Sequence, residues 1–165
     1  MVSQEVAKKP MSIELPYKEG DWFAVPLRDG GFAVGLVARA RRQGKILFGY
    51  FFGPRRASPP SLDELAGLSP KDALRALCFG DLGMIEQKWP IIGQLPCWSR
   101  EEWPMQDFVR RDEISGRAWR VRYSDVDPSE VIAEEAISSE NAELENDGLF
   151  GYGAVELLLT HLLSK

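Results

Sequence analysis

Hydrophobic residues early in the chain fall into three runs, at residues 22–27, 32–40 and 45–52, with short polar segments between them. β-Branched and aromatic side chains, which suit a pleated surface, are frequent in these runs. The first connection, Asp29-Gly30-Gly31, is typical of a tight hairpin because glycine readily adopts positive φ. The second connection, Arg42-Gln43-Gly44, is equally short. The pattern predicts a three-stranded antiparallel meander onto which the rest of the chain packs.

The second and third predicted strands have no polar face along most of their length. Alternate residues of a strand point to opposite sides, and both sets are apolar within residues 32–38 and 46–52. Such a sheet is either covered on both sides or curled into a small barrel. Gly35 and Gly49 lie in mid-strand, where glycine usually marks a bulge, a bend or a close backbone approach. These signals predict a strongly bent antiparallel sheet or a small, partly open barrel.

The segment after the meander predicts a short helical insert at about residues 61–78. Ser61 and Glu64 match a capping box, in which the serine caps the helix and the glutamate reaches back to the first turn. Ser69-Pro70 is a second helix start, because serine is a good N-cap and proline suits the first helical position. An apolar stripe follows, so we expect the second helix to end near Cys78.

The remainder of the chain predicts further strands and a final helix. Alternating apolar residues predict a fourth strand over residues 81–89 and shorter strands over 108–110 and 117–124. Residues 130–137 fit either a helix or a strand, and we favour a strand because a better helix start follows directly. Leucine and valine residues at helical spacing predict a C-terminal helix over residues 154–163.

Three other segments are less regular. Residues 13–16 suit a short edge strand, because proline is tolerated at strand edges and ends. Residues 89–108 contain tryptophans between prolines and predict a long ordered loop, since large rings usually pack down. Residues 141–146 predict one or two acidic helical turns.

Length and composition indicate one domain. The chain has 165 residues, which fits a flexible tail over residues 1–12 and a single β-rich domain over residues 13–165. The sequence contains no apolar run of about 18 residues and no secretory signal at its start. Cys78 and Cys97 form no motif, so we expect free thiols in a reducing cytoplasm. The predicted fold class is α+β and β-dominated, with about six to eight strands.

Charge is distributed unevenly along the chain. The net charge is −5, yet residues 125–147 hold nine acids and no lysine or arginine, so the remainder carries 16 acids against 20 bases, a net of +4. A run of like charge forms a solvated face or a docking surface for a partner of opposite charge. The acids of this run are Asp125, Asp127, Glu130, Glu134, Glu135, Glu140, Glu143, Glu145 and Asp147.

The sequence shows no catalytic constellation, and it predicts no cofactor and no metal site. The Gly-rich segment at residues 148–153 lacks the preceding strand and the GK[ST] signature of a phosphate loop. The acidic run lacks the alternating Asp, Asn and Gly of a calcium loop. His161 is the single histidine, and we expect it near the end of the final helix, where its charge favours the helix dipole. These features favour a binding protein over an enzyme.

Arginines on the predicted strands and loops support an alternative, in which a small β-barrel binds nucleic acid or peptide. Barrels that bind single-stranded nucleic acid combine basic and aromatic side chains. The aromatic residues of this chain lie in strongly apolar runs, however, and the negative net charge opposes phosphate binding at long range. Nucleic acid is therefore the less favoured partner. The candidate residues for this alternative are Arg39, Arg41, Arg120 and Arg122.

Several segments occur in a characteristic order: GDWFAVPLRDGGFAVGLVAR, GKILFGYFFGP, KWPIIG, WSREEWP, GRAWRVRYSD and GLFGYGAVE. Together they resemble the bacterial polymorphic-toxin immunity proteins of family 26, from about Gly20 to Glu156. The resemblance implies a β-dominated domain that neutralises a cognate toxin by binding it. We interpret the positions that the family shares as fold-forming. They correspond to Asp21, Phe23, Pro26, Leu27, Gly35, Trp89, Pro90 and Trp103.

The resemblance implies a cognate toxin domain as partner, and the acidic run indicates where that partner binds. A toxin that is a nuclease has a basic substrate groove, and an acidic patch steers such a partner and raises the association rate. We therefore expect a cytoplasmic immunity protein without catalysis, cofactor or membrane contact. The predicted partner-binding residues are Tyr123, as an anchor, and Asp125, Asp127, Glu130, Glu134 and Glu135.

Overall fold

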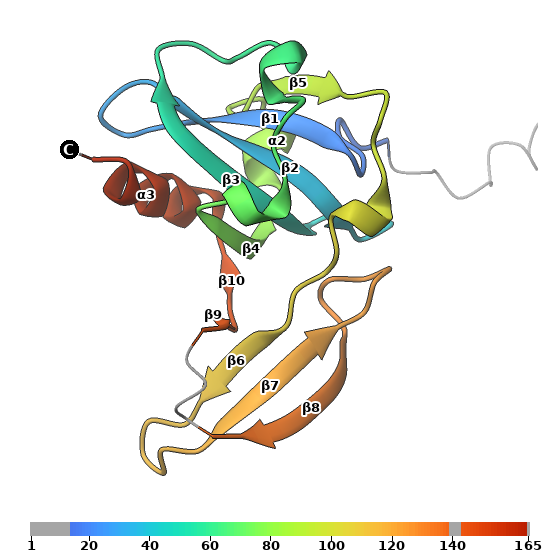
Figure 1. Ribbon diagram of the computed structural model, residues 1–165, viewed down its shortest axis with the longest axis vertical. Helices are drawn as coiled ribbons and strands as arrows, with labels where there is room; N and C mark the ends of the chain where they lie inside the picture. Colours follow the sequence, from blue (N-terminus) through green and yellow to red (C-terminus); the bar gives the residue numbers. More distant parts are fainter. Residues whose placement is uncertain (1–13, 139–142, 165) are drawn as a thin grey trace, which may run out of the picture.

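The computed structural model describes residues 14–138 and 143–164, and β-strands dominate these residues (Figure 1). The strands form two sheets. The large sheet contains β1 (Asp21–Pro26), β2 (Phe32–Ala40), β3 (Ile46–Arg56), β4 (Arg75–Gly80), β5 (Ile91–Gln94) and β10 (Leu149–Phe150). The small sheet contains β6 (Phe108–Arg111), β7 (Ala118–Tyr123), β8 (Val131–Ile137) and β9 (Glu145–Asn146).

Helical segments are short, apart from the last one. The turns of 3-10 helix are η1 (Leu62–Leu65), η2 (Pro70–Asp72) and η3 (Arg100–Glu102), and the α-helices are α2 (Leu82–Ile85) and α3 (Tyr152–Leu162). None of the helices in the described part of the chain is long and apolar enough to cross a membrane.

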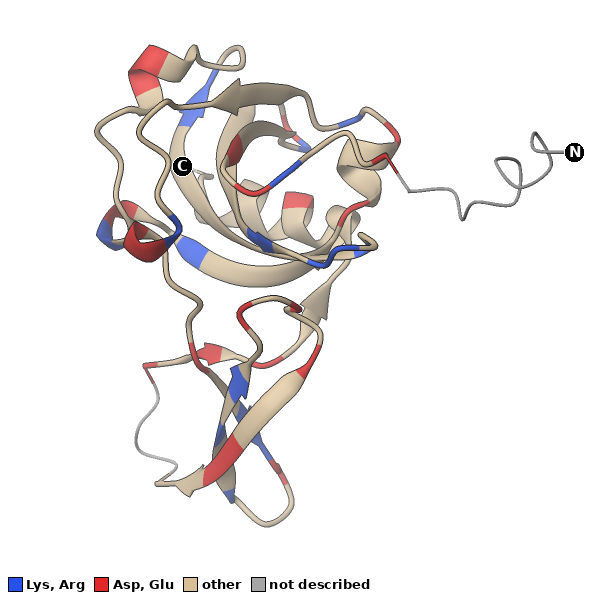
Figure 2. Ribbon diagram, turned by 90° about the vertical axis from the view of Figure 1, so that its right-hand side faces the viewer, with Lys and Arg blue, Asp and Glu red and all other residues tan. Residues whose placement is uncertain are grey.

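The large sheet has the order β10-β4-β3-β2-β1-β5, and the small sheet has the order β8-β7-β6-β9. The predicted meander is confirmed, because β1, β2 and β3 are successive antiparallel neighbours. The large sheet is strongly curved but stays open, with β10 and β5 at its two edges (Figure 2). The predicted fold class is therefore confirmed as a bent sheet with a C-terminal helix.

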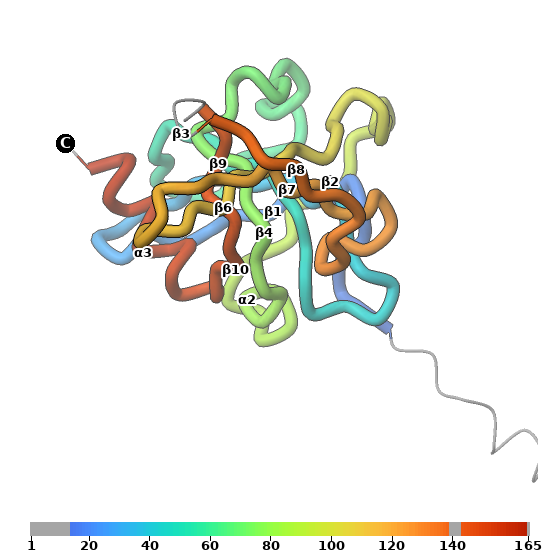
Figure 3. The backbone as a smooth tube through the Cα atoms, turned by 90° about the horizontal axis from the view of Figure 1, so that it is seen from below, coloured from blue at the N-terminus to red at the C-terminus, as the bar shows by residue number. Residues whose placement is uncertain are grey.

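Both faces of the large sheet are covered, as its two apolar faces predict. On one face Phe23 stacks on Trp89 with ring centroids 5.5 Å apart, and Val155 and Leu159 of α3 complete the cluster. On the other face Trp103 packs against strand residues of the large sheet, together with aromatic residues of the small sheet. Viewed from below, the small sheet lies across this end of the molecule (Figure 3).

The two mid-strand glycines of the meander lie where the backbone approaches other atoms closely. A Cβ added at Gly35 would lie 2.4 Å from the Phe23 ring, and one added at Gly49 would lie 2.6 Å from the Leu36 carbonyl oxygen. The β2–β3 pairing also shifts register between Val37 and Arg39. Both signals that mid-strand glycine predicts, close approach and irregular pairing, are therefore present.

The predicted helical insert is only partly helical. Its two helix starts are confirmed, since Ser61 and Ser69 each form a capping box, but each start leads to a single turn of 3-10 helix. The expected second helix to Cys78 is wrong, because residues 75–80 form β4 instead. Consecutive residues of β4 are buried in opposite core clusters, and this burial on both faces overrides the local helix signals.

The strand predicted over residues 81–89 is also wrong. The backbone carbonyl of Asp81 accepts bonds from the amides of Met84 and Ile85, which starts the short helix α2. Gly83 lies against the indole of Trp89: a Cβ added at Gly83 would be 2.7 Å from the nearest atom of that ring. This segment therefore forms a helical turn that packs against the Trp89 ring through Gly83.

The later strands and the final helix agree with the sequence pattern. The strands predicted over residues 108–110, 117–124 and 130–137 correspond to β6, β7 and β8, and the predicted C-terminal helix corresponds to α3. The long loop predicted over residues 89–108 is partly wrong, because it contains β5 and η3.

Two smaller expectations also fail. Residues 14–16 are not in a strand, although Leu15 packs against the core. Residues 145–146 form β9 rather than a helical turn. The remaining positions of those two segments, residues 13 and 141–142, and the expected tail over residues 1–12 lie outside the described residues. The division into a tail and one domain stays a prediction.

Candidate functional site

Aromatic packing joins the small sheet to the large one. The ring of Phe108 on β6 lies 6.1 Å from Phe48 on β3 and 5.7 Å from Tyr123 on β7, measured between centroids. Phe108 and Val121 are opposite each other in the β6–β7 pairing, and both are fully buried. The inner face of the small sheet is therefore held against the core, while its outer strand projects away from it (Figure 1).

Arg39 fixes the junction between the sheets from the side of β2. Its side chain is 4% exposed, and its Nε donates to the Asp125 carboxylate at 3.0 Å. Its Nη1 donates to the carbonyl oxygens of Ala38 at 2.6 Å and Trp103 at 3.0 Å. Its Nη2 donates to the Arg100 carbonyl oxygen at 3.3 Å. Arg39 thus ties η3 and the loop after β7 to the large sheet.

The other three arginines of the nucleic-acid alternative also lie beside carboxylates. Arg41 is 3.4 Å from Asp127. Arg120 is 3.0 Å from Glu135 and 3.6 Å from Asp107. Arg122 donates to Asp107 through Nε at 3.1 Å and Nη2 at 3.2 Å, a bidentate contact. Because each guanidinium faces a carboxylate, none of the four charges is free to act alone on an anion.

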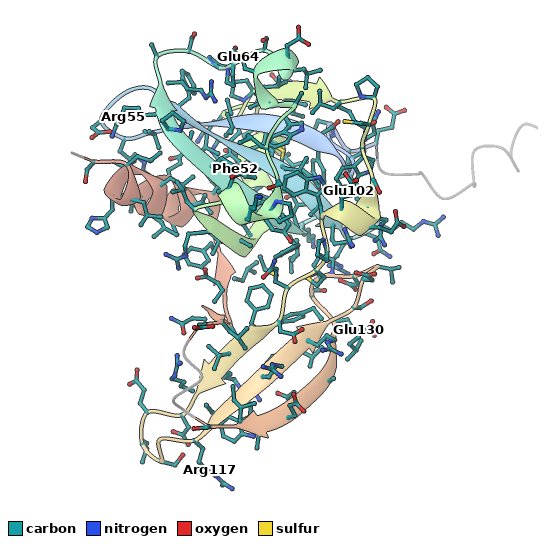
Figure 4. The ribbon with its side chains drawn as sticks, viewed as in Figure 1. Phe52, Arg55, Glu64, Glu102, Arg117 and Glu130 are labelled. Atoms are coloured by element: carbon teal, nitrogen blue, oxygen red, sulfur yellow. The ribbon has the colours of Figure 1, made fainter. Side chains whose placement is uncertain are left out.

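The acidic run is the counterpart of these arginines. Glu134 bonds Arg110 within the small sheet, and Glu145 bonds Arg75 of the large sheet. Of the predicted partner-binding acids, Glu130 alone makes no ion pair with a described residue, and Figure 4 shows it at the upper end of β8. Blue and red segments alternate on the small sheet in Figure 2. Charges that are separated in the sequence are therefore paired in space.

Two groups of the candidate surface have shifted pKa values. Hydrogen bonds from Ser129, together with the nearby charge of Arg41, hold the pKa of the Asp127 carboxyl below its usual value. Burial raises the pKa of Tyr123 well above its usual value, and its hydroxyl donates to Asp147. Asp127 is therefore ionised and Tyr123 neutral at physiological pH. The Tyr123 hydroxyl is engaged internally, so what Tyr123 offers a partner is the exposed part of its ring.

The outer strand β8 is the most exposed element of the small sheet. Its residues are exposed from Val131 to Ala136 and half-buried at Ile137, with exposed fractions of 44% at Val131 and 57% at Ile132. The β7–β8 register shifts beside Tyr123, so Ile132 has no direct partner across the pair. Ile132 instead lines an open pocket of about 490 Å³ at the junction of the sheets.

The structure brings five of the six predicted partner-binding residues to β8 and the loop before it, and the sixth, Tyr123, to the adjoining end of β7. Sequence reasoning missed the pairing of the acids with arginines from four other strands, because such pairing depends on strand order. It also missed the edge position of β8. The signal was that each alternating face of residues 131–137 carries a glutamate, Glu135 on one and Glu134 on the other, because a strand buried on both faces seldom carries unpaired acids.

The residues that could bind a metal are dispersed. Within residues 14–138 and 143–164, no three His, Cys, Asp or Glu side chains gather into a possible metal site. The carboxylates of the small sheet face guanidinium groups instead of one another. The arrangement offers a mixed-charge surface with an exposed strand at its edge.

Comparison with protein families gives a match over most of the large sheet. The model of the family described as Immunity protein 26 matches residues 18–120, which is more than half of the chain. No curated protein and no solved structure matches the chain. The matched residues run from just before β1 into β7, so β8 and the loop before it lie beyond the match.

Proposed function

The chain belongs to the immunity protein 26 family, and we propose that it neutralises a cognate bacterial toxin by binding the toxin directly, without catalysis. Family membership implies an immunity protein with a toxin as its partner. The match over residues 18–120 is the observation that carries this proposal. We place the complex in the cytoplasm of the cell that makes both proteins, where an incoming or newly made toxin acts.

We propose that the toxin contacts the outer part of the small sheet. This surface combines the six residues singled out by the sequence, namely Tyr123, Asp125, Asp127, Glu130, Glu134 and Glu135. Four of the five acids already face arginines, at Arg39, Arg41, Arg110 and Arg120. The surface therefore offers alternating charges with defined positions, a pattern that gives specificity and correct register more than raw affinity.

A basic nuclease fits this surface as the toxin. The side chains of Asp125 and Glu135 are 62% and 63% exposed despite their ion pairs, and a carboxylate has lone pairs for more than one donor. A basic groove on the toxin could share these carboxylates with their present arginines. Glu130 adds a carboxylate without an internal ion pair among the described residues.

The test of this function uses the polypeptide encoded beside this chain as the probe. The two proteins are co-purified, their affinity is measured, and growth is scored in cells that express the probe with or without this chain. Dedicated inhibitors reach nanomolar affinity or better, so we expect a tight complex and rescued growth. A soluble, toxic probe that neither binds nor is neutralised by this chain would refute the proposal.

Charge reversal tests the surface itself. The double variant Glu134→Lys, Glu135→Lys is expected to weaken binding of the probe by about tenfold or more at low salt, because attraction becomes repulsion. Its matched control is Glu14→Lys, Asp63→Lys, which makes the same change in net charge at two exposed sites away from the small sheet. Equal affinities of the double variant and the wild-type chain would place the interface elsewhere.

A further inference from the structure

We propose that β8 receives an extended strand of the toxin along its free edge, so that the toxin continues the small sheet. This inference rests on the proposed function and specifies how the complex forms. Within the described residues β8 is the end strand of its sheet, and β7 is the strand with which it pairs. Figure 1 shows β8 on the outer side of the small sheet.

An edge strand leaves half of its backbone groups without partners in the sheet. Every second N–H and C=O of an antiparallel edge strand points away from its neighbour, and these groups form a ready template for another strand. β8 runs from Val131 to Ile137, which is longer than an average strand of about five to six residues. The edge is therefore long enough for several main-chain hydrogen bonds.

The strand carries only some of the devices that block unwanted pairing. Natural edge strands are protected by proline, by charged side chains (lysine above all), by bulges, or by a covering helix or loop. Residues 131–137 contain no proline and no lysine, and their charged side chains are the two glutamates, Glu134 and Glu135. The one irregularity is the register shift at Ile132, near the start of the strand. The remaining residues pair regularly with β7.

Charge decides which strand fits this edge. If a second copy of the chain paired antiparallel along β8, Glu134 and Glu135 near the centre would face the same acids of the copy. Like charges directly opposite one another destabilise a sheet. A strand with lysine or arginine at the central positions would instead complete an alternating row, with Arg120 on one side of Glu135 and the incoming base on the other. The occupant we assign is therefore a basic-centred strand of the toxin.

One end of β8 gives the incoming strand its register. Val131 and Ile132 are the most apolar exposed pair on the strand, and Ile132 borders the open pocket beside Tyr123. An apolar side chain of the toxin can enter this pocket while its basic residues meet the two glutamates. β8 also lies beyond the residues that the family model matches, as expected for a surface that must suit one particular toxin.

Amide hydrogen exchange, read residue by residue by NMR, tests this contact. The free protein and its complex with the neighbouring polypeptide are compared over residues 131–137. In the free protein, every second amide of β8 should exchange rapidly, because it points away from β7. In the complex these same amides should exchange about 100-fold more slowly or slower still, since each then donates to the toxin backbone. If the toxin contacted β8 through side chains alone, these amides would still exchange rapidly.

A single charge reversal on β8 provides a second test, in which binding affinity is measured. Glu135→Lys is expected to weaken binding of the neighbouring polypeptide about tenfold, while Asp63→Lys, with the same charge change on η1, should bind as the wild type does. The fold should survive, because Arg120 keeps its contact with Asp107. Circular dichroism and the unfolding midpoint check this for both variants.

The outcomes separate the two proposals. Tight binding with unchanged β8 amides would overturn strand addition and leave the immunity function standing. Absence of both binding and rescue would overturn both. Concentration-dependent protection of β8 in the protein alone would assign the edge to a second copy and overturn the assignment to the toxin.

Discussion

At the scale of single residues, a contact among Phe23, Gly35 and Trp89 holds one face of the core together. Phe23 and Trp89 stack almost parallel, with an interplanar angle of 6°. Gly35 lies directly against the same phenyl ring. Trp89 also donates from its Nε1 to the buried carboxylate of Glu156 at 2.9 Å, which links the stack to α3. These positions are among those that the family resemblance singles out, and their burial supports a fold-forming role.

The Gly35→Ala substitution should therefore destabilise the protein. An added methyl would lie 2.4 Å from the fully buried Phe23 ring, so the ring or the backbone would have to shift within a packed core. We expect a loss of about 1–3 kcal/mol in the free energy of unfolding, measured by urea denaturation. The control is Gly67→Ala, where a Cβ would meet nothing within 4 Å. Equal stability of the two variants would show that the Phe23 contact is not tight.

The two cysteines should differ sharply in reactivity. Burial raises the pKa of the Cys78 thiol to about 12, whereas Cys97 is exposed. The thiolate is the reactive form, and a thiol with this pKa is ionised to about one part in ten thousand at pH 8. Titration of the folded protein with a disulfide reagent should therefore detect one fast thiol, and titration after unfolding should detect two. Two fast thiols in the folded protein would contradict this assignment.

Cys78 also links stability to pH. Its pKa in the folded protein exceeds the unfolded value of about 8.5, so its neutral form is favoured by folding. This contribution is complete below about pH 8.5 and is lost as the pH rises toward the folded value. The midpoint temperature of unfolding should accordingly decrease as the pH is raised above about 8.5.

At the scale of elements, the two sheets depend on Arg39 for their connection. This buried guanidinium bonds a carboxylate and the backbone carbonyls of β2, η3 and the residue that follows η3. The neighbouring Arg41 makes one ion pair with Asp127, and its side chain is 29% exposed. Two arginines that are close in sequence therefore have different structural roles.

Replacing each arginine by methionine compares these roles. Arg39→Met removes the donors of several buried carbonyls, and we expect it to cost about 3 kcal/mol in the free energy of unfolding. Arg41→Met removes a partly exposed ion pair and should cost less than about 1 kcal/mol. Thermal or urea unfolding of the two variants measures the difference. If Arg41→Met proved the more damaging change, the junction would depend on the Asp127 loop.

Sequence reasoning succeeded for elements with a strong local signal and failed where burial decided. The hairpin at Asp29-Gly30-Gly31, the alternation in residues 117–124 and the leucine stripe of α3 each predicted their element correctly. Residues 75–80 carry a helix start before them, yet they fill the space between β3 and β10 as a strand. No local pattern of that segment indicates two strand neighbours, because both lie far away in the sequence.

At the scale of the whole molecule, the charges form a network that crosses between the sheets. Arg75 of β4 bonds Glu145 of β9, and Arg39 of β2 bonds Asp125 beyond β7. Arg100 of η3 adds bonds to Glu19 and to the backbone of Asp125. The acidic run of the sequence therefore lies against arginines of the large sheet as well as of its own sheet. The acidic composition of the run could be predicted from the sequence. Its pairing with arginines could not, because most of these partners lie in segments far away along the chain.

This network leads to a prediction for polyanions. With a net charge of −5 and with Arg39, Arg41, Arg120 and Arg122 each beside a carboxylate, the protein should not be retained on a heparin column at about 0.1 M salt, where the Debye screening length is about 10 Å. Elution salt is the measured quantity, and a known basic nucleic-acid-binding protein is the positive control. Retention beyond physiological salt would revive the nucleic-acid alternative with Arg39, Arg41, Arg120 and Arg122.

The path of the chain between the sheets bears on how such a protein can diversify. The chain leaves the large sheet after β5, builds the small sheet, and returns through β10 to α3. Insertions or substitutions at the far end of the small sheet therefore shift no strand register in the large one. Over successive generations, substitutions can accumulate in the outer strand and its loops while the residues of the large sheet stay the same. Under the binding mode proposed above, adaptation to a new toxin would require changes only in this small part of the chain.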